Sequence, residues 1–199
     1  MLVREARAML HQREHRRFSV PEYLAIEENA PAKSEYCNGE IFSMGGGTLE
    51  HNRIVRNLLR QLDVALDGRT CEVFPSDLRL YVKSQKLFTY PDVMVVCGQP
   101  RLLAGRKDTI TDATLIVEVL STSTQDYDRN EKFRSYRELA SFAEYLLVAQ
   151  DAVCVEHHRR QAPGQWLMTE HISSAVDLEL TSIGVKLALA SIYRGVLPK

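Results

Sequence analysis

Two apolar stretches decide the fold: "YPDVMVVC" at residues 90–97 and "TLIVEVLS" at residues 114–121. Both are rich in β-branched residues and short enough to be buried strands. Each also carries a carboxylate, Asp92 near the start of the first stretch and Glu118 in the middle of the second. A buried carboxylate without a partner is costly, so it changes its protonation state or finds a cation. The question is which cation these two acids meet.

The composition is that of an ordinary globular chain, with 199 residues, 45% hydrophobic and 26% charged. A chain of this length buries about 70% of its unfolded surface and needs no metal or disulfide to fold. We expect one domain over residues 19–199, preceded by a basic extension over residues 1–18. Because the sequence shows no membrane-spanning run and no signal peptide, we expect a cytoplasmic protein. The net charge of −1 argues against holding DNA by bulk electrostatics and leaves a local basic patch as the alternative.

The four cysteines stand at positions 37, 71, 97 and 154, without a C-x-x-C pair. Three of them lie in apolar, strand-like surroundings. Their wide spacing is not that of a zinc site, so we expect reduced thiols in the core.

Cap and turn signals define the N-terminal elements. The stretch "SVPEYLAIEENA" predicts a helix with Ser19 as its N-cap and Glu22 completing the capping box. An Asn38-Gly39 turn predicts a hairpin in "SEYCNGEIFSM". A glycine turn and Thr48 then begin a long amphipathic helix that ends at Gly68.

The rest of the chain alternates strands with one further helix. Strands are expected at "CEVF", "DLRLYV" and the two opening stretches, with residues 98–113 as a surface loop. Asp128 and Glu131 predict the capping box of the next helix. Antiparallel strands then close the chain before a short helix at residues 187–196. This order predicts an α/β (α+β) fold around one mixed sheet.

The two-residue period of a strand places Glu118 on one face of its strand and Val119 on the other. Two acids on neighbouring strands repel one another unless a cation lies between them, and Mg²⁺ binds through one or two carboxylates plus waters. The alternatives are that Glu118 pairs with an arginine such as Arg79, and that Asp92 only caps a turn behind Pro91.

Several motifs in order resemble one family. They are "SEYCNGEIFSM", the histidine of "LEHNRIVRNLL", "SDLRLYV", "YPDVMVV", "IVEVLSTST" and "DRNEKFRSYRELASFAEYLLV". Together they resemble the PD-(D/E)xK nuclease superfamily and, within it, the restriction endonucleases of the Uma type. The resemblance covers most of the chain. It implies a restriction-endonuclease-like mixed β-sheet flanked by helices, with an N-terminal helix and hairpin, and hydrolytic cleavage of DNA.

The resemblance also implies the site. Asp92 and Glu118 would be ligands of Mg²⁺, with Mn²⁺ as a substitute and the Val119 carbonyl as a third ligand. The superfamily lysine expected two residues after the glutamate is replaced by Leu120. Uma-type proteins look similar here and carry the lysine on the following helix, where this chain has Lys132. That ammonium would orient the attacking water or stabilise the developing charge.

Glu40, His51 and Glu35 also match polar positions of the family, and we rank Glu40 and His51 above Glu35 as further catalytic candidates. Asp77 could support the site from outside. Because one site cuts one strand, double-strand cleavage predicts a homodimer. A catalytically inactive nuclease-fold protein that binds nucleic acid or a partner protein remains the alternative function. A small-molecule hydrolase using the same acids is a third.

Overall fold

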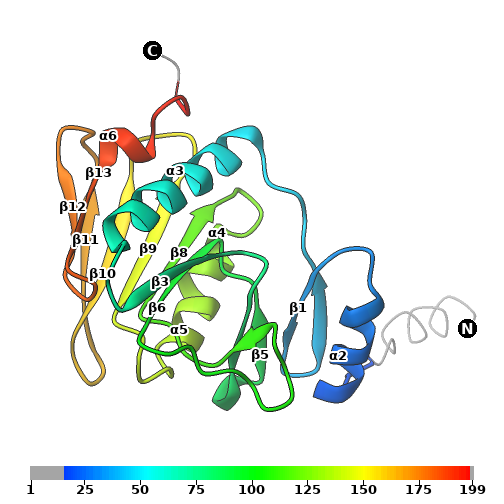
Figure 1. The fold of residues 1–199 in the computed structure, drawn as a ribbon. Helices are drawn as coiled ribbons and strands as arrows, with labels where there is room; N and C mark the ends of the chain where they lie inside the picture. Colours follow the sequence, from blue (N-terminus) through cyan, green and yellow to red (C-terminus); the bar gives the residue numbers. More distant parts are fainter. Residues whose placement is uncertain (1–15, 198–199) are drawn as a thin grey trace, which may run out of the picture.

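The two opening stretches form adjacent strands of the larger of two main sheets (Figure 1). In the computed structural model, which describes residues 16–197, β6 and β8 pair antiparallel with Val93 opposite Val117. β9 lies parallel to β8, and all other neighbours in this sheet are antiparallel. The sheet runs in the order β11 (Gln165–His171), β10 (Val155–Ala162), β9 (Glu144–Ala149), β8 (Leu115–Leu120), β6 (Val93–Cys97), β3 (Cys71–Pro75).

A second, five-stranded sheet corrects the expectation of one sheet. Its order is β2 (Glu40–Ser43), β1 (Ser34–Cys37), β5 (Leu87–Thr89), β4 (Arg79–Val82), β7 (Thr109–Ile110). The strand β7 lies inside the predicted surface loop, yet both of its residues are buried. With two residues, this strand is too short to show a period in the sequence, and the same holds for the three residues of β5.

The N-terminal caps form as predicted. α2 (Val20–Asn29) begins with the full capping box of Ser19 and Glu22. In α3 (Leu49–Leu66), the Thr48 side chain accepts a hydrogen bond from the His51 amide. The hairpin turn is also confirmed, with Asn38 at φ 45° and Gly39 at φ 103°.

The helical segment after β8 begins earlier than the predicted capping box. It comprises α4 (Gln125–Tyr127), a π-helical turn η2 (Asp128–Lys132) and α5 (Phe133–Tyr136). Asp128 therefore lies inside the helical segment and is not an N-cap. Its side chain is buried and faces Lys132, four residues later.

The C-terminal part forms a separate two-stranded sheet of β12 (Asp177–Leu180) and β13 (Val185–Ala188). The predicted helix at residues 187–196 is shorter than expected, because its first two residues belong to β13 and only α6 (Leu189–Ile192) is α-helical. The remaining short element is a 3₁₀ turn, η1 (Lys83–Gln85).

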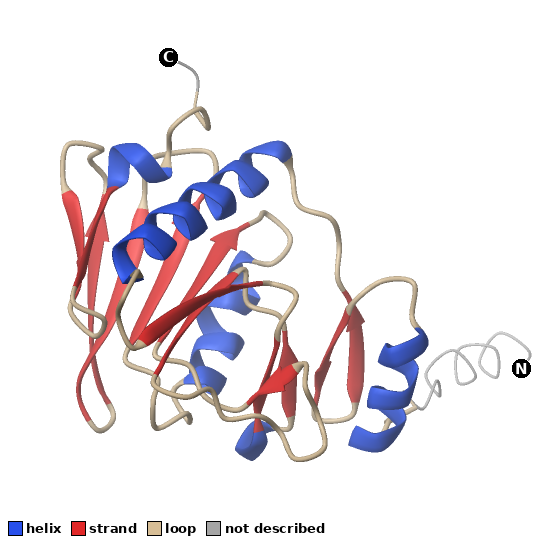
Figure 2. Ribbon diagram, in the orientation of Figure 1, coloured by secondary structure: helices blue, strands red, loops and turns tan. Residues whose placement is uncertain are grey.

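Helices cover both faces of the larger sheet (Figure 2). On one face α3 and α6 pack on Val117 and Val119 of β8, and on the other Ile116 and Leu120 pack with α5 and the second sheet. The predicted alternation of β8 is thus confirmed. A third cluster, centred on Tyr23, joins α2 to the smaller sheet. Between residues 16 and 197 no helix is long and apolar enough to cross a membrane.

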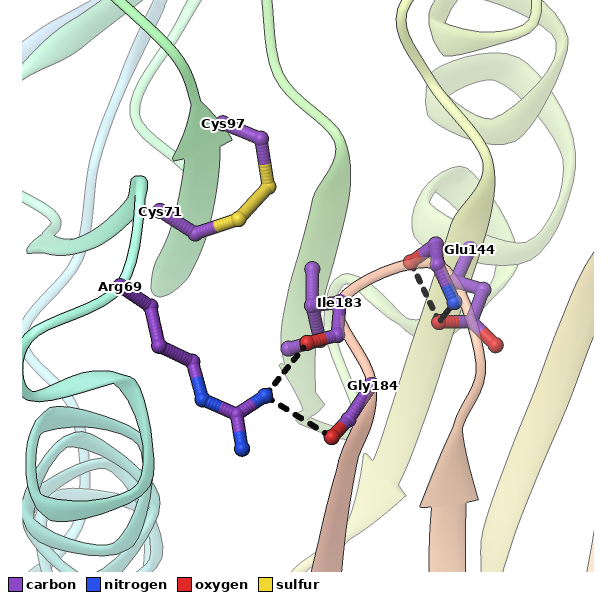
Figure 3. The surroundings of a disulfide bond; sticks show 7 residues. Arg69, Cys71, Cys97, Glu144, Ile183 and Gly184 are labelled. Carbon is purple, nitrogen blue, oxygen red and sulfur yellow. Dashed lines mark hydrogen bonds between the residues drawn. A yellow bond between two sulfur atoms is a disulfide. The ribbon is translucent and has the colours of Figure 1, made fainter.

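A disulfide between Cys71 and Cys97 contradicts the expectation of reduced thiols at these positions (Figure 3). The two residues lie directly opposite one another in the β3–β6 ladder, a register that spacing alone does not reveal. Nearby, Arg69 donates hydrogen bonds to the carbonyls of Ile183 and Gly184, which ties the end of α3 to the β12–β13 turn. Cys37 and Cys154 are free.

Candidate active site

The buried ammonium of Lys132 lies among three carboxylates. Its Nζ is 3.1 Å from Glu35 Oε1, 3.2 Å from Glu118 Oε1 and 3.2 Å from Asp128 Oδ1. None of these four side chains is more than 8% exposed. Lys132 therefore lies beside Glu118, as predicted, and is not a solvated lysine on the surface of the helix.

Three separate elements deliver these groups. Glu118 shares the face of β8 that packs toward α5, and the π-helical turn η2 places Lys132 above that face. Asp128 reaches Lys132 from the same turn. Glu35 arrives from β1, which has neighbours on both sides in the smaller sheet and is therefore an inner strand. The site thus lies where the two sheets meet the helical segment.

Two hydroxyl groups hold the carboxylates of Glu118 and Glu35 in place by hydrogen bonds. Tyr136 Oη donates to Glu118 Oε1 at 2.8 Å, and Thr89 Oγ1 donates to Glu35 Oε1. The two hydroxyls are themselves 3.4 Å apart. Neither role was predicted from the sequence. Tyr136 stands one helical turn after Lys132, which is a signal for a shared face, whereas nothing in the sequence marks Thr89.

Asp92 immediately precedes Val93, the first residue of β6, and so lies just beyond the Val93–Val117 pair of β6 and β8. Its Oδ2 accepts a hydrogen bond of 2.7 Å from the Val119 amide, and its Oδ1 is 3.2 Å from His51 Nε2. Asp92 thus contacts β8 and α3, and the alternative that it only caps a turn behind Pro91 is wrong. The hydrogen bond from the Val119 amide holds the Asp92 carboxylate next to the residue that follows Glu118. The contact with His51 brings the start of α3 to the site.

Burial and charge set the protonation states. Burial raises the pKa of Glu118 well above its usual value, and Lys132 opposes this shift. Burial lowers the pKa of Lys132, but Glu118, Glu35 and Asp128 more than reverse this effect, so the ammonium stays protonated. The pKa of Asp128 is raised by burial. The hydrogen bond to Asp92 raises the pKa of His51.

The structure does not bring Glu40 into this cluster. Glu40 lies on the edge strand β2, half-exposed and 4.0 Å from Arg17 Nη2, so the hairpin acid at the site is Glu35. The ranking of Glu40 above Glu35 is therefore not supported by position. Asp77 pairs with Lys33 on the surface.

The alternative that Glu118 pairs with Arg79 is wrong, because Arg79 Nη2 pairs with Asp108 Oδ2 at 2.8 Å. Farther along the chain, His157 is buried, with its Nε2 3.1 Å from Glu144 Oε1.

The donor set suits a hard divalent cation. Asp92 and Glu118 supply carboxylate oxygens, and Glu118 Oε2 accepts no hydrogen bond from residues 16–197. Residues 16–197 contain no group of three or more His, Cys, Asp or Glu side chains placed to hold a metal ion. Mg²⁺ does not require such a group, since it commonly keeps several waters and uses one or two carboxylates. Asp92, Glu118 and the Val119 carbonyl are thus chemically adequate ligands.

The architecture matches that of a solved nuclease-type structure. A protein from Anabaena variabilis ATCC 29413, described as "a putative nuclease belonging to DUF820", superposes with a TM-score of 0.72. The match covers 89% of this chain and 98% of that one at 16% identity, which shows a shared fold.

Comparison of the sequence with family models identifies the family of this chain. The family model of Uma2, described as "Putative restriction endonuclease", matches residues 20–190, and the chain belongs to this family. Two relatives from Synechocystis sp. (strain ATCC 27184 / PCC 6803 / Kazusa) are similar over most of their length. The uncharacterized protein sll1609 is 39% identical over 160 residues, covering 80% of this chain and 90% of its own. The uncharacterized protein slr1290 is 41% identical over 182 residues, covering 90% and 93%.

Proposed function

We propose that this protein is a Mg²⁺-dependent endonuclease that hydrolyses phosphodiester bonds of DNA at the Asp92, Glu118 and Lys132 site. The observation that carries the proposal is the position of Lys132 Nζ, buried and 3.2 Å from Glu118 Oε1. The lysine missing from β8 is thereby supplied from the helix, on the side of the strand where the superfamily would place it. Membership of the family supports the same reaction class.

In this mechanism, bound Mg²⁺ supplies Lewis-acid chemistry and a water of lowered pKa. Asp92 and Glu118 hold the ion, and the Val119 amide keeps Asp92 oriented. Lys132 acts as a fixed positive charge and hydrogen-bond donor rather than as a base, because its three carboxylate neighbours keep it protonated. Tyr136 fixes the rotamer of Glu118. Preorganised charge of this kind stabilises a phosphoryl group that gains negative charge during attack.

A plasmid cleavage assay tests the proposal. With Mg²⁺, the wild type should convert supercoiled DNA to nicked or linear forms, and EDTA should stop the reaction. Asp92→Asn, Glu118→Gln and Lys132→Met should each lower the rate at least 100-fold, since each removes a ligand or a charge at the reacting phosphate. The Lys186→Met variant changes an exposed lysine of β13 and should cleave like the wild type.

Equal cleavage by the wild type and the three site variants would overturn the proposal, because the activity would then come from a contaminating nuclease. The homodimer is part of the same proposal. Linear product formed directly from supercoiled plasmid, together with a dimer in size-exclusion chromatography with light scattering, would support two cooperating sites. Only nicked product and a monomer would contradict them.

One observation favours the second candidate function, a nuclease fold that binds DNA or a partner without cleaving it. Both oxygens of Asp92 already contact protein groups, the Val119 amide and the His51 ring. If that arrangement persists with Mg²⁺, the carboxylate is not free to bind the ion. DNA binding by the wild type without Mg²⁺-dependent cleavage would identify this function.

A further inference from the structure

The outward face of α3 carries a row of arginines. Arg53, Arg56 and Arg60 are spaced by three and four residues, so they share one side of the helix. The opposite side packs into the core through residues such as Ile54 and Leu58. Arg56 and Arg60 are exposed and Arg53 is partly exposed. The row therefore faces away from the sheet.

These arginines lack acidic partners. Within residues 16–197, none of the three has a carboxylate oxygen within 4.0 Å, and Arg56 donates only to the Asn57 side-chain oxygen. Elsewhere in the same region, six arginines do form such ion pairs: Arg16, Arg17, Arg79, Arg101, Arg106 and Arg129. Arg69, Arg134, Arg137, Arg159 and Arg160 also lack such partners among residues 16–197, but Arg53, Arg56 and Arg60 form a continuous row on one side of a single helix.

A fourth arginine, Arg194, lies next to α3 on the C-terminal segment. The Asn57 side-chain amide donates to the carbonyls of Ile192 at 2.9 Å and Arg194 at 3.0 Å. This pair of hydrogen bonds ties the segment after α6 to α3 and brings the exposed Arg194 beside the helix. Arg194 also has no carboxylate within 4.0 Å among residues 16–197. We call Arg53, Arg56, Arg60 and Arg194 the α3 basic face.

The helix that carries the row begins at the candidate active site, with His51 on its inner side and the arginines on its outer side. α3 begins one residue after Thr48, and His51 in its first turn contacts Asp92. With a rise of 1.5 Å per residue, Arg53 lies about 3 Å and Arg60 about 14 Å beyond His51 along the helix axis. Asp63 on the same helix and Asp67 at its C-cap follow, and they mark where the row ends.

We propose that the α3 basic face binds the phosphate backbone of duplex DNA that runs along the outer side of α3. This inference rests on the proposed nuclease function and adds a contact surface for the substrate away from the cleaved bond. Guanidinium groups suit phosphate because their planar fork donates two parallel hydrogen bonds. The row from Arg53 to Arg60 is about 10 Å long, which matches about three phosphates of one strand at 3.4 Å of duplex axis each. The charge is local, so it is compatible with the near-neutral chain.

Binding of a fluorescein-labelled 30-base-pair duplex, followed by anisotropy in EDTA so that no cleavage occurs, tests the proposal. The triple variant Arg53→Gln, Arg56→Gln, Arg60→Gln keeps the core face of α3 intact and should fold with an unchanged melting temperature. Each lost phosphate contact lowers the slope of log K against log salt concentration by about 0.9. The triple variant should therefore show a slope smaller by about 2.7 and bind at least tenfold more weakly at 0.1 M salt.

A matched control removes the same charge elsewhere. The variant Lys83→Gln, Lys107→Gln, Lys186→Gln changes three exposed lysines outside α3 and should bind with the wild-type slope. An equal loss in both triple variants would overturn the proposal, since bulk charge would then explain binding. A wild-type slope in the arginine variant, or no duplex binding by the wild type, would overturn it as well.

The binding and cleavage assays together distinguish failure of this proposal from failure of the nuclease function. If the arginine variant loses binding but the wild type never cleaves plasmid with Mg²⁺, the α3 basic face stands and the catalytic proposal falls. If the wild type cleaves while the arginine variant keeps the full salt slope, catalysis stands and the α3 basic face is wrong.

Discussion

Replacement of Lys132 by methionine tests the charge arrangement of the site through stability alone. The ammonium lies 3.1–3.2 Å from three carboxylate oxygens and is at most 8% exposed. Methionine keeps most of the volume but leaves three buried acids without their cation. Breaking a buried ion pair by removing one partner destabilises a protein by about 3–5 kcal/mol. Against a typical free energy of unfolding of 5–15 kcal/mol, this is a large fraction. Urea unfolding at pH 8 would measure it.

The free energy of unfolding of the Lys132→Met variant should also depend on pH. Without Lys132, burial keeps the folded-state pKa of Glu118 and Asp128 above their unfolded values. The folded variant then binds more protons than the unfolded chain, so its stability should rise as the pH falls from 8 to 5. Adding Glu35→Gln to Lys132→Met should recover part of the loss, because one stranded charge disappears. A loss below about 1 kcal/mol without pH dependence would show that Lys132 does not neutralise the buried acids. Lys186→Met is the control and should stay within about 0.5 kcal/mol of the wild type.

Three further predictions concern His51, Glu144 and the disulfide. A Cβ on Gly47 would lie 2.6 Å from His51 Cδ2, so Gly47→Ala should displace the imidazole and lower its NMR-measured pKa toward 6.5. Gly46→Ala, which meets nothing within 4 Å, should leave that pKa unchanged, and an equal effect of both would contradict the packing argument. Although burial raises the pKa of Glu144, hydrogen bonds lower it overall, so the stability it contributes should be present above pH 4.5 and be lost at lower pH. Urea unfolding against pH should show a shallower acid loss in Glu144→Gln, and identical profiles would exclude this role. The β3–β6 disulfide links residues 26 apart, so its reduction should lower the free energy of unfolding by about 3.5 kcal/mol in urea titrations with and without dithiothreitol, and unchanged midpoints would argue against a structural bond.

Local signals predicted the elements whose chemistry is local. The capping box of Ser19 and the Asn38-Gly39 turn are read from adjacent residues, and both form as expected. The alternation in β8 correctly predicted the face that carries Glu118, because side chains alternate across any strand. Only the family resemblance, however, indicated Lys132, since one lysine on a helix carries no signal of burial.

Long-range registers could not be predicted. The disulfide depends on the exact pairing of β3 with β6, and Glu35 meets Lys132 only because β1 is an inner strand of the second sheet. Glu40 belongs to the same hairpin but lies on the edge strand, so it remains half-exposed. The expectation that Asp128 caps the start of a helix was wrong for a different reason. A D-x-x-E spacing occurs both at a helix start and inside a helix, and only the position of the first turn distinguishes the two.

The proposed function requires that Asp92 and Glu118 hold one divalent cation beside Lys132. A crystal structure of the protein grown with Mn²⁺, recorded at the manganese absorption edge, would locate such an ion. We expect an anomalous peak about 2.1 Å from an oxygen of each carboxylate, as for a hard six-coordinate ion, and its disappearance in Asp92→Asn. Ordered carboxylates with no peak between them, while Mn²⁺ binds elsewhere on the chain, would contradict it.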